Sequence, residues 1–377
     1  MSDPLVIAGG GMSGLTLAAY LAPAPVVVFD DGHRPVEAMS WASWSDRPGL
    51  LDAAVSRRFD RIRVHVAGRT RVLGLGRYRY RVVRGADLVR VVRGIAPACR
   101  FHRGHVDRVE DGRLVVDGTP MAAAWVFDSV LGVDATVDAR LTFRGWHVRV
   151  ERPVFDPDVP TLFDFRTPQL GGASFVYVLP VDAHRALVEH TSFVAPDATV
   201  PRQDDALAEY LDLLGADDYA VERLEAATLP LSARATPRRH GDVLTIGAKG
   251  GLLKASTGYA YQRVQRDSAA IARSLRRHGH PFDLPEPPRR FRLYDGTLLD
   301  VITGRPAELE RAFAAVFLHT TAEPGLRFLD ERTSLAQEMR LFAAMPKATY
   351  LAAVRRRLGA PAPRGAAALD RCPDDEA

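Results

Sequence analysis

The sequence predicts an α/β protein in which a parallel βαβ unit, an antiparallel β-sheet and a helical cap are combined. Three observations support this fold class. The chain opens with an apolar run, a glycine-rich turn, a helical stretch and a second apolar run within residues 5–30. Short alternating segments between Gly, Pro and Asp turns fill the middle, from about Asp60 to Thr236. Helical periodicity then dominates from the breaker-rich segment 281–290 to Leu358. An apolar stripe at helical spacing marks this part, formed by Leu309, Ala312, Phe313, Val316 and Phe317.

The composition is that of a globular chain long enough for about two domains. Of its 377 residues, 47% are hydrophobic and 25% charged, and the formal net charge of +4 is scattered along the chain without a dense basic run. Nucleic-acid binding is therefore not expected. A mild basic excess suits an anionic cofactor or acidic membrane headgroups equally well. The two cysteines, Cys99 and Cys372, and the eleven histidines show no disulfide framework and no metal-ligand spacing, so no metal site is expected.

The N-terminal region and the hydropathy pattern predict a cytoplasmic protein. The start lacks a positively charged signal region, and the apolar run Leu5 to Ala8 passes directly into glycines. No stretch approaches the ~20 apolar residues that span a bilayer. Arg355 to Arg357 follow an apolar helical stretch, which leads us to expect peripheral attachment to the inner face of the membrane.

The glycine-rich turn predicts a Rossmann-type dinucleotide site. It is formed by Gly9, Gly11, Met12, Ser13 and Gly14. In the pattern G-x-G-x-x-G, Gly9 permits the tight turn, Gly11 lets the backbone approach a pyrophosphate, and Gly14 lets helix and strand pack closely. Asp30, at the end of the next apolar run, is expected to accept hydrogen bonds from the adenosine ribose. The alternative for three glycines alone is an ordinary strand-to-helix turn.

The dinucleotide is expected to be FAD, because flavoproteins commonly open with this motif, an argument from fold analogy. No second G-x-G-x-x-G follows. NAD(P)H, as the external reductant, would therefore dock without a Rossmann domain of its own.

Several stretches together resemble the bacterial flavin-dependent lycopene cyclases, particularly those of actinobacterial type. They occur in the expected order and cover most of residues 1–355. The stretches are MSWASWSD (39–46), RYRYRVVRGADLVRVV (77–92), 143–166, SFVYVLPVDAHRALVEHTSF (174–193), STGYAYQRVQRDSAAIA (256–272) and GLRFLDERTSL (325–335).

This resemblance implies a glutathione-reductase-like, two-domain flavoprotein fold in which the antiparallel sheet lies over the flavin. It assigns residues 1–60, 85–140 and 238–280 to an FAD-binding domain, 61–84 and 141–237 to a substrate domain, 281–290 to a linker, 291–358 to a helical C-terminal region and 359–377 to a disordered tail.

The resemblance also implies an isomerase of carotenoid biosynthesis that acts as an intramolecular lyase on a lipophilic polyene. Reduced FAD is required although no net electrons move. An end group of lycopene is protonated, the cation closes on a neighbouring double bond, and loss of a proton gives a β-ring. An acidic motif, FLEET in plants and with Glu-Asp in many bacteria, supplies the essential carboxyl group.

Glu189 takes the place of the first acid of that motif. His190 stands where the second acid is common, which puts a paired-carboxylate mechanism in doubt. On a strand, Glu189 and His190 point to opposite faces. Glu189 lies among apolar residues, where burial favours the neutral acid that protonation of an alkene needs.

The segment from Ile246 to Tyr259 is expected to be the second flavin contact. Its candidate residues are Gly247, Thr257, Gly258 and Tyr259, with Thr257 and Gly258 at a helix start. Many flavoproteins have an Asp shortly after the first glycine of this segment. Ala248 and Lys249 stand here instead, so no ribityl-binding acid is assigned.

Other aromatic and basic residues have two interpretations. Trp41, Trp44, Trp146 and the stretch 163–165 are core residues or line a polyene channel. We interpret Arg144, Arg149 and Arg166 as salt-bridged structural groups.

The resemblance leaves alternatives to lycopene cyclisation open. One is the same chemistry on another prenylated or polyene substrate, which the departure at His190 leaves open. Another is a flavin-dependent monooxygenase or oxidoreductase, and a third is a silent flavin-binding partner of a carotenoid assembly.

Overall fold

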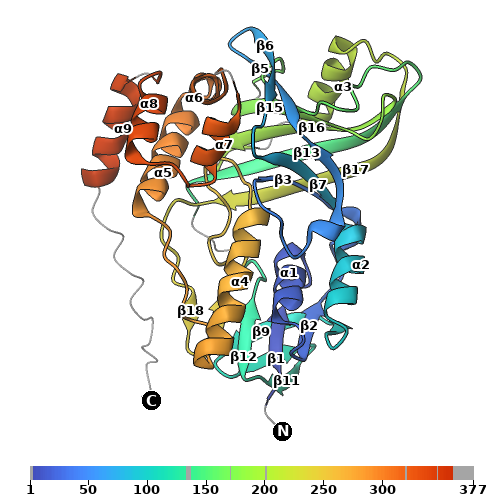
Figure 1. The fold of residues 1–377 in the computed structure, drawn as a ribbon, viewed down its shortest axis with the longest axis vertical. Helices are drawn as coiled ribbons and strands as arrows, with labels where there is room; N and C mark the ends of the chain where they lie inside the picture. The colour runs from blue at the N-terminus through green and yellow to red at the C-terminus, as the bar shows by residue number, and fades with distance from the viewer. Residues whose placement is uncertain are drawn as a thin grey trace, which may run out of the picture.

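The computed structural model describes residues 3–132, 137–169, 171–199, 202–318, 321–345 and 347–359 (Figure 1). Apart from Gly359, the segment predicted to be a disordered tail lies outside the described residues. In Figure 1 the N-terminal βαβ unit (residues 5–30) lies in the lower part beside the helix of residues 261–278, the large antiparallel sheet crosses the upper part, and the C-terminal helices stand beside that sheet.

A six-stranded, mostly parallel sheet carries the N-terminal βαβ unit. Its order is β18-β19-β12-β1-β2-β8, and only β18 runs antiparallel to its neighbour. The strands are β1 (Leu5–Ala8), β2 (Val26–Asp30), β8 (Arg100–Arg103), β12 (Trp125–Asp128), β18 (Arg239–His240) and β19 (Val243–Thr245). Buried β-branched residues such as Ile7 and Val28 form its core with helices α1 (Met12–Leu21), α2 (Gly85–Ile95) and α4 (Tyr261–His278).

A seven-stranded sheet forms the upper part, in the order β17-β13-β16-β15-β14-β5-β6. Its strands are β5 (Arg61–Val66), β6 (Arg69–Gly74), β13 (Ala139–Val150), β14 (Thr161–Asp164), β15 (Ala173–Pro180), β16 (Arg185–Val194) and β17 (Tyr219–Leu231). Neighbouring strands are antiparallel except β14 and β5. Alternation of side chains gives this sheet two distinct faces.

Each face of the seven-stranded sheet is covered differently. Helix α3 (Gln203–Leu213) packs Leu207, Tyr210 and Leu211 against one face, which we call the α3 face. The opposite face joins the aromatic core cluster that includes Phe175 and Phe313, and we call it the inner face.

Two small sheets complete the strand structure of the described residues. One has the order β3-β7-β4, with β3 (Ser40–Ser45), β4 (Val55–Phe59) and β7 (Arg79–Arg84). The other has the order β11-β10-β9, with β9 (Val106–Glu110), β10 (Arg113–Val116) and β11 (Thr119–Ala122). Short 3-10 helices occupy Val36–Ala38 and Asp52–Ala54.

The C-terminal helices are α5 (Arg289–Gly304), α6 (Ala307–Phe317), α7 (Glu323–Leu329), α8 (Leu335–Phe342) and α9 (Lys347–Gly359). All of the predicted apolar stripe on α6 is buried: Leu309, Ala312, Phe313, Val316 and Phe317. Ser334 caps α8 through a capping box with Gln337. Of the helices in the described ranges, none is long and apolar enough to cross a membrane.

The fold class predicted from the sequence is confirmed, with local differences. The strand-rich middle also contains α2 and α3. Helix α5 begins at Arg289, two residues inside the segment predicted as a linker. Helix α4 begins at Tyr261, so Thr257 and Gly258 lie in the turns before the helix rather than at its first turn.

Candidate active site

The glycine loop joins the end of β1 to the start of α1. Gly9 adopts a φ of +97°, and a Cβ at Gly14 would lie 2.0 Å from the Gly9 carbonyl oxygen, so a side chain at Gly14 would prevent this close packing. A Cβ at Gly11 would meet no atom within 4 Å. The loop therefore leaves open space beside Gly11 at the N-terminus of a helix, where a phosphate group is favoured.

Asp30 is held against this loop by two backbone groups. Its Oδ2 accepts a hydrogen bond from the Gly10 N–H at 2.7 Å, and its Oδ1 accepts one from the Gly32 N–H at 2.8 Å. Each carboxylate oxygen has a second lone pair, so the group keeps acceptor capacity for a ribose hydroxyl.

The segment 246–259 returns to the same loop from the far end of the sequence. A Cβ at Gly247 would lie 2.4 Å from Ser13 Oγ, so the two predicted contact segments touch. Met12 packs beside the core of the six-stranded sheet. Thr257 is buried, and its Oγ1 accepts a hydrogen bond from the Tyr259 N–H at 3.4 Å.

Lys249, which occupies the position of the missing acid, forms an ion pair with the buried Asp128 at the end of β12. A carboxylate is therefore present near this point, supplied by a different strand. The open cradle at Gly11, the anchored Asp30 and the contact between Ser13 and Gly247 together fit a bound dinucleotide.

Glu189 lies in the middle of β16 on the inner face of the seven-stranded sheet. Tyr177 on β15 and Gly145 on β13 are its direct partners across the strands. The side chain is partly buried, and its Oε1 accepts a hydrogen bond from Thr191 Oγ1 at 3.1 Å. Burial, and secondly the negative charge of Glu225, raise the pKa of Glu189 to about 8, while the Thr191 hydrogen bond opposes the rise. Glu189 is therefore a neutral acid at pH 7.

Three tyrosines connect Glu189 to the segment predicted to contact the flavin. Tyr80 and Tyr259 share a hydrogen bond of 3.0 Å between their hydroxyls, and Tyr177 is also hydrogen-bonded to Tyr259. The neighbouring Gly258 packs so closely on the inner face that a Cβ there would lie 2.4 Å from Leu141 Cδ2. Burial raises the pKa of Tyr259 to about 12, so its hydroxyl stays protonated. The fold thus brings together residues 80, 177, 189 and 259.

His190 points away from this site. It is fully buried on the α3 face, with Nδ1 lying 3.2 Å from Gln203 Nε2. Burial lowers the pKa of His190 to about 4, so the ring is neutral. The expectation that Glu189 and His190 face opposite sides is confirmed, and His190 does not replace a second acid.

The aromatic candidates divide between core positions and the neighbourhood of the site. The ring of Trp44 lies 4.4 Å from that of Tyr259, whereas Trp41 packs beside the core of the six-stranded sheet. Trp146 lies on the α3 face and donates a hydrogen bond to Asp204, so it does not line the inner face. Phe163 and Phe165 are buried in the inner-face cluster.

The three arginines are paired as expected. Arg144 binds Asp204 at 2.8 Å, Arg149 binds Glu222 at 3.1 Å and Arg166 binds Asp164 at 2.7 Å.

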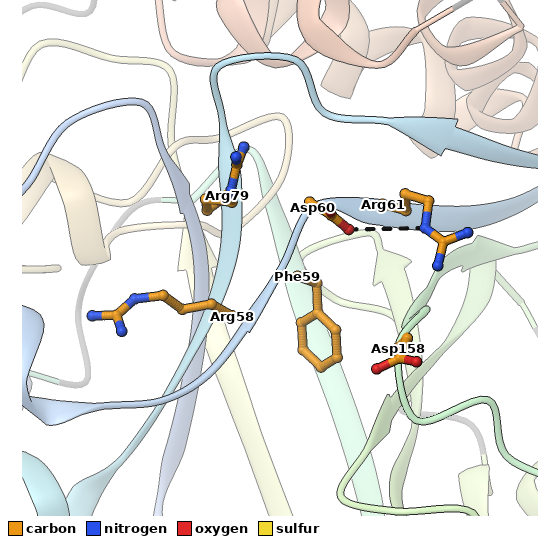
Figure 2. Close-up of a pocket in the computed structure, with 6 residues that line it drawn as sticks. All are labelled: Arg58, Phe59, Asp60, Arg61, Arg79 and Asp158. Atoms are coloured by element: carbon orange, nitrogen blue, oxygen red, sulfur yellow. Dashed lines mark ion pairs between the residues drawn. The ribbon is translucent and has the colours of Figure 1, made fainter.

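Two open surface pockets lie apart from Glu189. One, of about 420 Å³, is lined by Arg58, Phe59, Asp60, Arg61, Arg79 and Asp158 (Figure 2). The other, of about 560 Å³, is lined by Arg144, Trp146, Asp204, Val221, Glu222, Arg223 and Leu224. Neither pocket contains a candidate residue for cofactor binding or for proton transfer.

In the described ranges, no group of three or more His, Cys, Asp or Glu side chains is arranged to hold a metal ion.

Sequence reasoning missed Tyr80, Tyr177 and Glu225. Tyr177 could have been found from its strand pairing, because hairpin geometry places SFVYVLP against RALVEHTSF. Tyr80 and Glu225 come from strands whose pairing has no local signal.

The parallel sheet with its glycine loop, together with the antiparallel sheet over it, defines the fold of FAD-dependent flavoenzymes. Solved structures with this fold include a geranylgeranyl bacteriochlorophyll reductase-like protein from Thermoplasma acidophilum, with a TM-score of 0.62 at 12% identity over 93% of this chain and 98% of that chain. A flavin-dependent brominase has a TM-score of 0.61 at 14% identity over 91% of this chain and 98% of that chain.

A comparison with protein families identifies the chain further. The family described as lycopene cyclase protein matches residues 4–355, and the chain belongs to that family. An uncharacterized carotenoid cyclase of Deinococcus radiodurans is 28% identical over 73% of this chain and 70% of that protein. Lycopene beta cyclase of Arabidopsis thaliana is 24% identical over 73% of this chain, and the match spans 60% of the plant protein.

Proposed function

We propose that this protein is a lycopene cyclase-like enzyme that forms β-type rings on a linear carotenoid without net redox change. The observation that carries the proposal is Glu189, a partly buried carboxyl group whose pKa is raised to about 8 on the sheet face that meets the segment predicted to contact the flavin. A neutral carboxylic acid in an apolar setting is suited to protonate an alkene. Membership of the lycopene cyclase family supports a carotenoid as the substrate class.

In the proposed reaction, Glu189 gives its proton to the terminal double bond of the polyene end group. The resulting cation closes on the neighbouring double bond, and loss of one proton from the new ring restores a neutral product of unchanged composition. Glu189 then regains a proton.

FAD in its reduced form is the proposed cofactor, with NAD(P)H as the external reductant. Gly9, Gly11, Met12, Ser13, Gly14 and Asp30 would hold the adenosine and pyrophosphate part, and Gly247, Thr257, Gly258 and Tyr259 would lie near the flavin ring. When bound, the reduced flavin supplies negative charge that favours a nearby cation. Fixed charge acts strongly where water is excluded.

The test is anaerobic incubation of the purified protein with reduced FAD and lycopene, followed by chromatography of the carotenoids. The wild type should form cyclic product, and in deuterated water each new ring should gain one deuterium. Glu189→Gln should keep the fold and flavin but lose product by ~10²-fold or more, the scale of a missing general acid.

Glu222→Gln is the matched control, because Glu222 is an exposed glutamate paired with Arg149 on the surface of β17. Unimpaired cyclisation by Glu189→Gln would remove Glu189 from the mechanism. Oxidation of one flavin per ring, or substrate-dependent consumption of NAD(P)H and oxygen, would support the monooxygenase alternative instead. If the protein cyclised a different polyene and not lycopene, the proposed substrate would be wrong but the proposed reaction would hold.

A further inference from the structure

A second carboxyl group faces Glu189 from another strand. Gly145 on β13 pairs with Glu189 on β16 and, on its other side, with Glu225 on β17. Residues paired directly across neighbouring strands point to the same face of a sheet. Glu189 and Glu225 therefore share the inner face and are separated by one strand, which places their Cα atoms about 9–10 Å apart.

The residue between them has no side chain. A Cβ at Gly145 would lie 2.8 Å from Leu187 Cδ1 and 3.7 Å from both Cβ and Cγ of Glu189. Any larger residue would stand between the two carboxyl groups and crowd Leu187. Because residue 145 is a glycine, no side chain of β13 stands between Glu189 and Glu225 at that position.

Glu225 has the partners of an ionised carboxylate. Its Oε1 lies 2.8 Å from Arg223 Nη2 and 2.6 Å from His147 Nε2, and it accepts a hydrogen bond from Ser40 Oγ at 3.1 Å. The side chain is 9% exposed. Buried carboxylates keep their charge when a cation and hydrogen-bond donors hold them. Arg223 also donates to the Ala38 carbonyl at 2.6 Å, which holds one end of its guanidinium on the segment before β3.

Glu189 has no comparable cationic partner among the described groups that act on it. From its own strand Thr191 donates a hydrogen bond, and from β15, β7 and the segment before α4 come the hydroxyls of Tyr177, Tyr80 and Tyr259. Helix α5, which also contacts β16, adds the apolar Leu298, Leu299 and Ile302 to the inner-face cluster. Glu225 on β17 is the charged group that acts on Glu189, and its effect is to raise the pKa of that carboxyl.

We propose that Glu225 is the second carboxyl group of this site, a positioning residue held by Ser40, His147 and Arg223 that, across the gap at Gly145, keeps the proton on Glu189. This inference rests on the proposed function of Glu189 as the proton donor. It also answers the question raised by His190, because the second acid comes from β17 instead of from the next residue of β16. The Ser40, His147 and Arg223 contacts hold Glu225 in place for this role.

The experiment is a direct titration of the Glu189 carboxyl group by infrared difference spectroscopy on the purified flavin-loaded protein. The carbonyl stretch of the protonated acid is assigned by its loss in Glu189→Gln. In Glu225→Gln the titration midpoint should move about one pH unit toward acid, the size expected for one charge about 10 Å away at an effective dielectric constant of about 20. Glu225→Asp, which keeps the charge, should stay close to wild type.

Glu222→Gln removes one exposed carboxylate from the same strand and should leave the midpoint unchanged. An unchanged midpoint in Glu225→Gln, or an equal shift in Glu222→Gln, would overturn the inference. The titration needs no turnover, so its result does not depend on which polyene the enzyme accepts.

The pH dependence of the cyclisation rate is a second measurement, made with an active substrate. Glu225→Gln should shift the alkaline limb of the rate profile toward lower pH and retain the maximal rate at low pH. A loss of rate at every pH would overturn a role that acts only through Glu189.

Discussion

Glu189 and His190 are adjacent in the chain but lie on opposite faces of the seven-stranded sheet. Glu189 pairs with Tyr177 and Gly145 on the inner face, whereas His190 pairs with Val176 and Arg144 on the α3 face. Successive side chains of a strand alternate in direction, so the residue after Glu189 cannot reach the same substrate from this backbone. Packing against α3, and not the chemistry at Glu189, therefore determines which residue suits position 190.

We predict that His190→Asp, which restores an acid after Glu189, does not increase cyclisation. The new carboxylate would be buried beside Gln203, while the neighbouring Arg144 is already bound to Asp204 at 2.8 Å. Stability at neutral pH should fall by about 3–5 kcal/mol, as expected for a buried charge without a cationic partner. Chemical denaturation and product chromatography measure both effects, with His190→Gln as the neutral control. Higher turnover of His190→Asp would contradict the assignment of this residue to packing.

The sequence predicted those parts of the fold that depend on local patterns. The βαβ unit was visible because Gly9, Gly11 and Gly14 carry constraints that act within a few residues. The stripe on α6 was visible because helical periodicity marks its buried face. Glu189 was found through the family motif and its alternation with apolar neighbours.

The remaining site residues depend on long-range pairing. Glu225 joins the site only because β17 and β16 both pair with β13, and the register that sets Gly145 between the two acids depends on the whole sheet. Tyr80 reaches Tyr259 across a sequence separation of 179 residues. No local pattern encodes such contacts.

Gly11→Val should abolish flavin binding while leaving the fold intact. A Cβ at Gly11 meets no protein atom within 4 Å, so the side chain is tolerated but fills the space expected for the pyrophosphate. Flavin absorbance after purification, with circular dichroism for the fold, measures this. Gly14→Val is a contrasting variant, because its Cβ would lie 2.0 Å from the Gly9 carbonyl oxygen and should disturb folding itself. Full flavin occupancy in Gly11→Val would place the cofactor elsewhere.

Lys254→Met should destabilise the contact between the segment 246–259 and the C-terminal helices. Lys254 Nζ is almost fully buried, 3.0 Å from Asp295 and 3.1 Å from Glu331. Burial acts to raise the pKa of Glu331, but the charges of Lys254 and Arg263 lower it below its ordinary value. Removing the lysine leaves the buried Asp295 without its cation and leaves Glu331 with Arg263 at 3.8 Å, so a loss of about 3–5 kcal/mol is expected. Thermal denaturation tests this, with Lys347→Met on the exposed start of α9 as the control. Equal stability of the two variants would contradict a structural role for Lys254.

Peripheral membrane binding should depend on helices α8 and α9. Exposed apolar side chains recur there four and seven residues apart, at Leu335 with Met339 and at Leu351 with Leu358, close to the basic Arg355 and Arg356. Such a combination binds anionic lipid surfaces. In flotation with anionic liposomes the wild type should rise with the vesicles, and Leu335→Ser with Met339→Ser should reduce the bound fraction several-fold. Sedimentation of the wild type as free protein at low salt would count against this attachment.

Ring closure should be fastest below pH 8 and fall as the pH rises further. The pKa of Glu189 is raised to about 8 from an ordinary value of 4.5, chiefly by burial, so the proton donor is present below pH 8 and is lost above it. Each further pH unit should then reduce the rate about tenfold.

The raised pKa of Glu189 also makes the stability of the fold depend on pH. Between pH 4.5 and about 8 the folded protein keeps a proton on Glu189 that the unfolded chain releases. The contribution of Glu189 to the free energy of unfolding is therefore complete below pH 4.5 and is lost as the pH rises through about 8. Glu189→Gln has no such dependence and should gain stability relative to wild type as the pH increases. Denaturation of both proteins between about pH 5 and about pH 9 measures the difference, and parallel curves would mean that Glu189 titrates at its ordinary pKa.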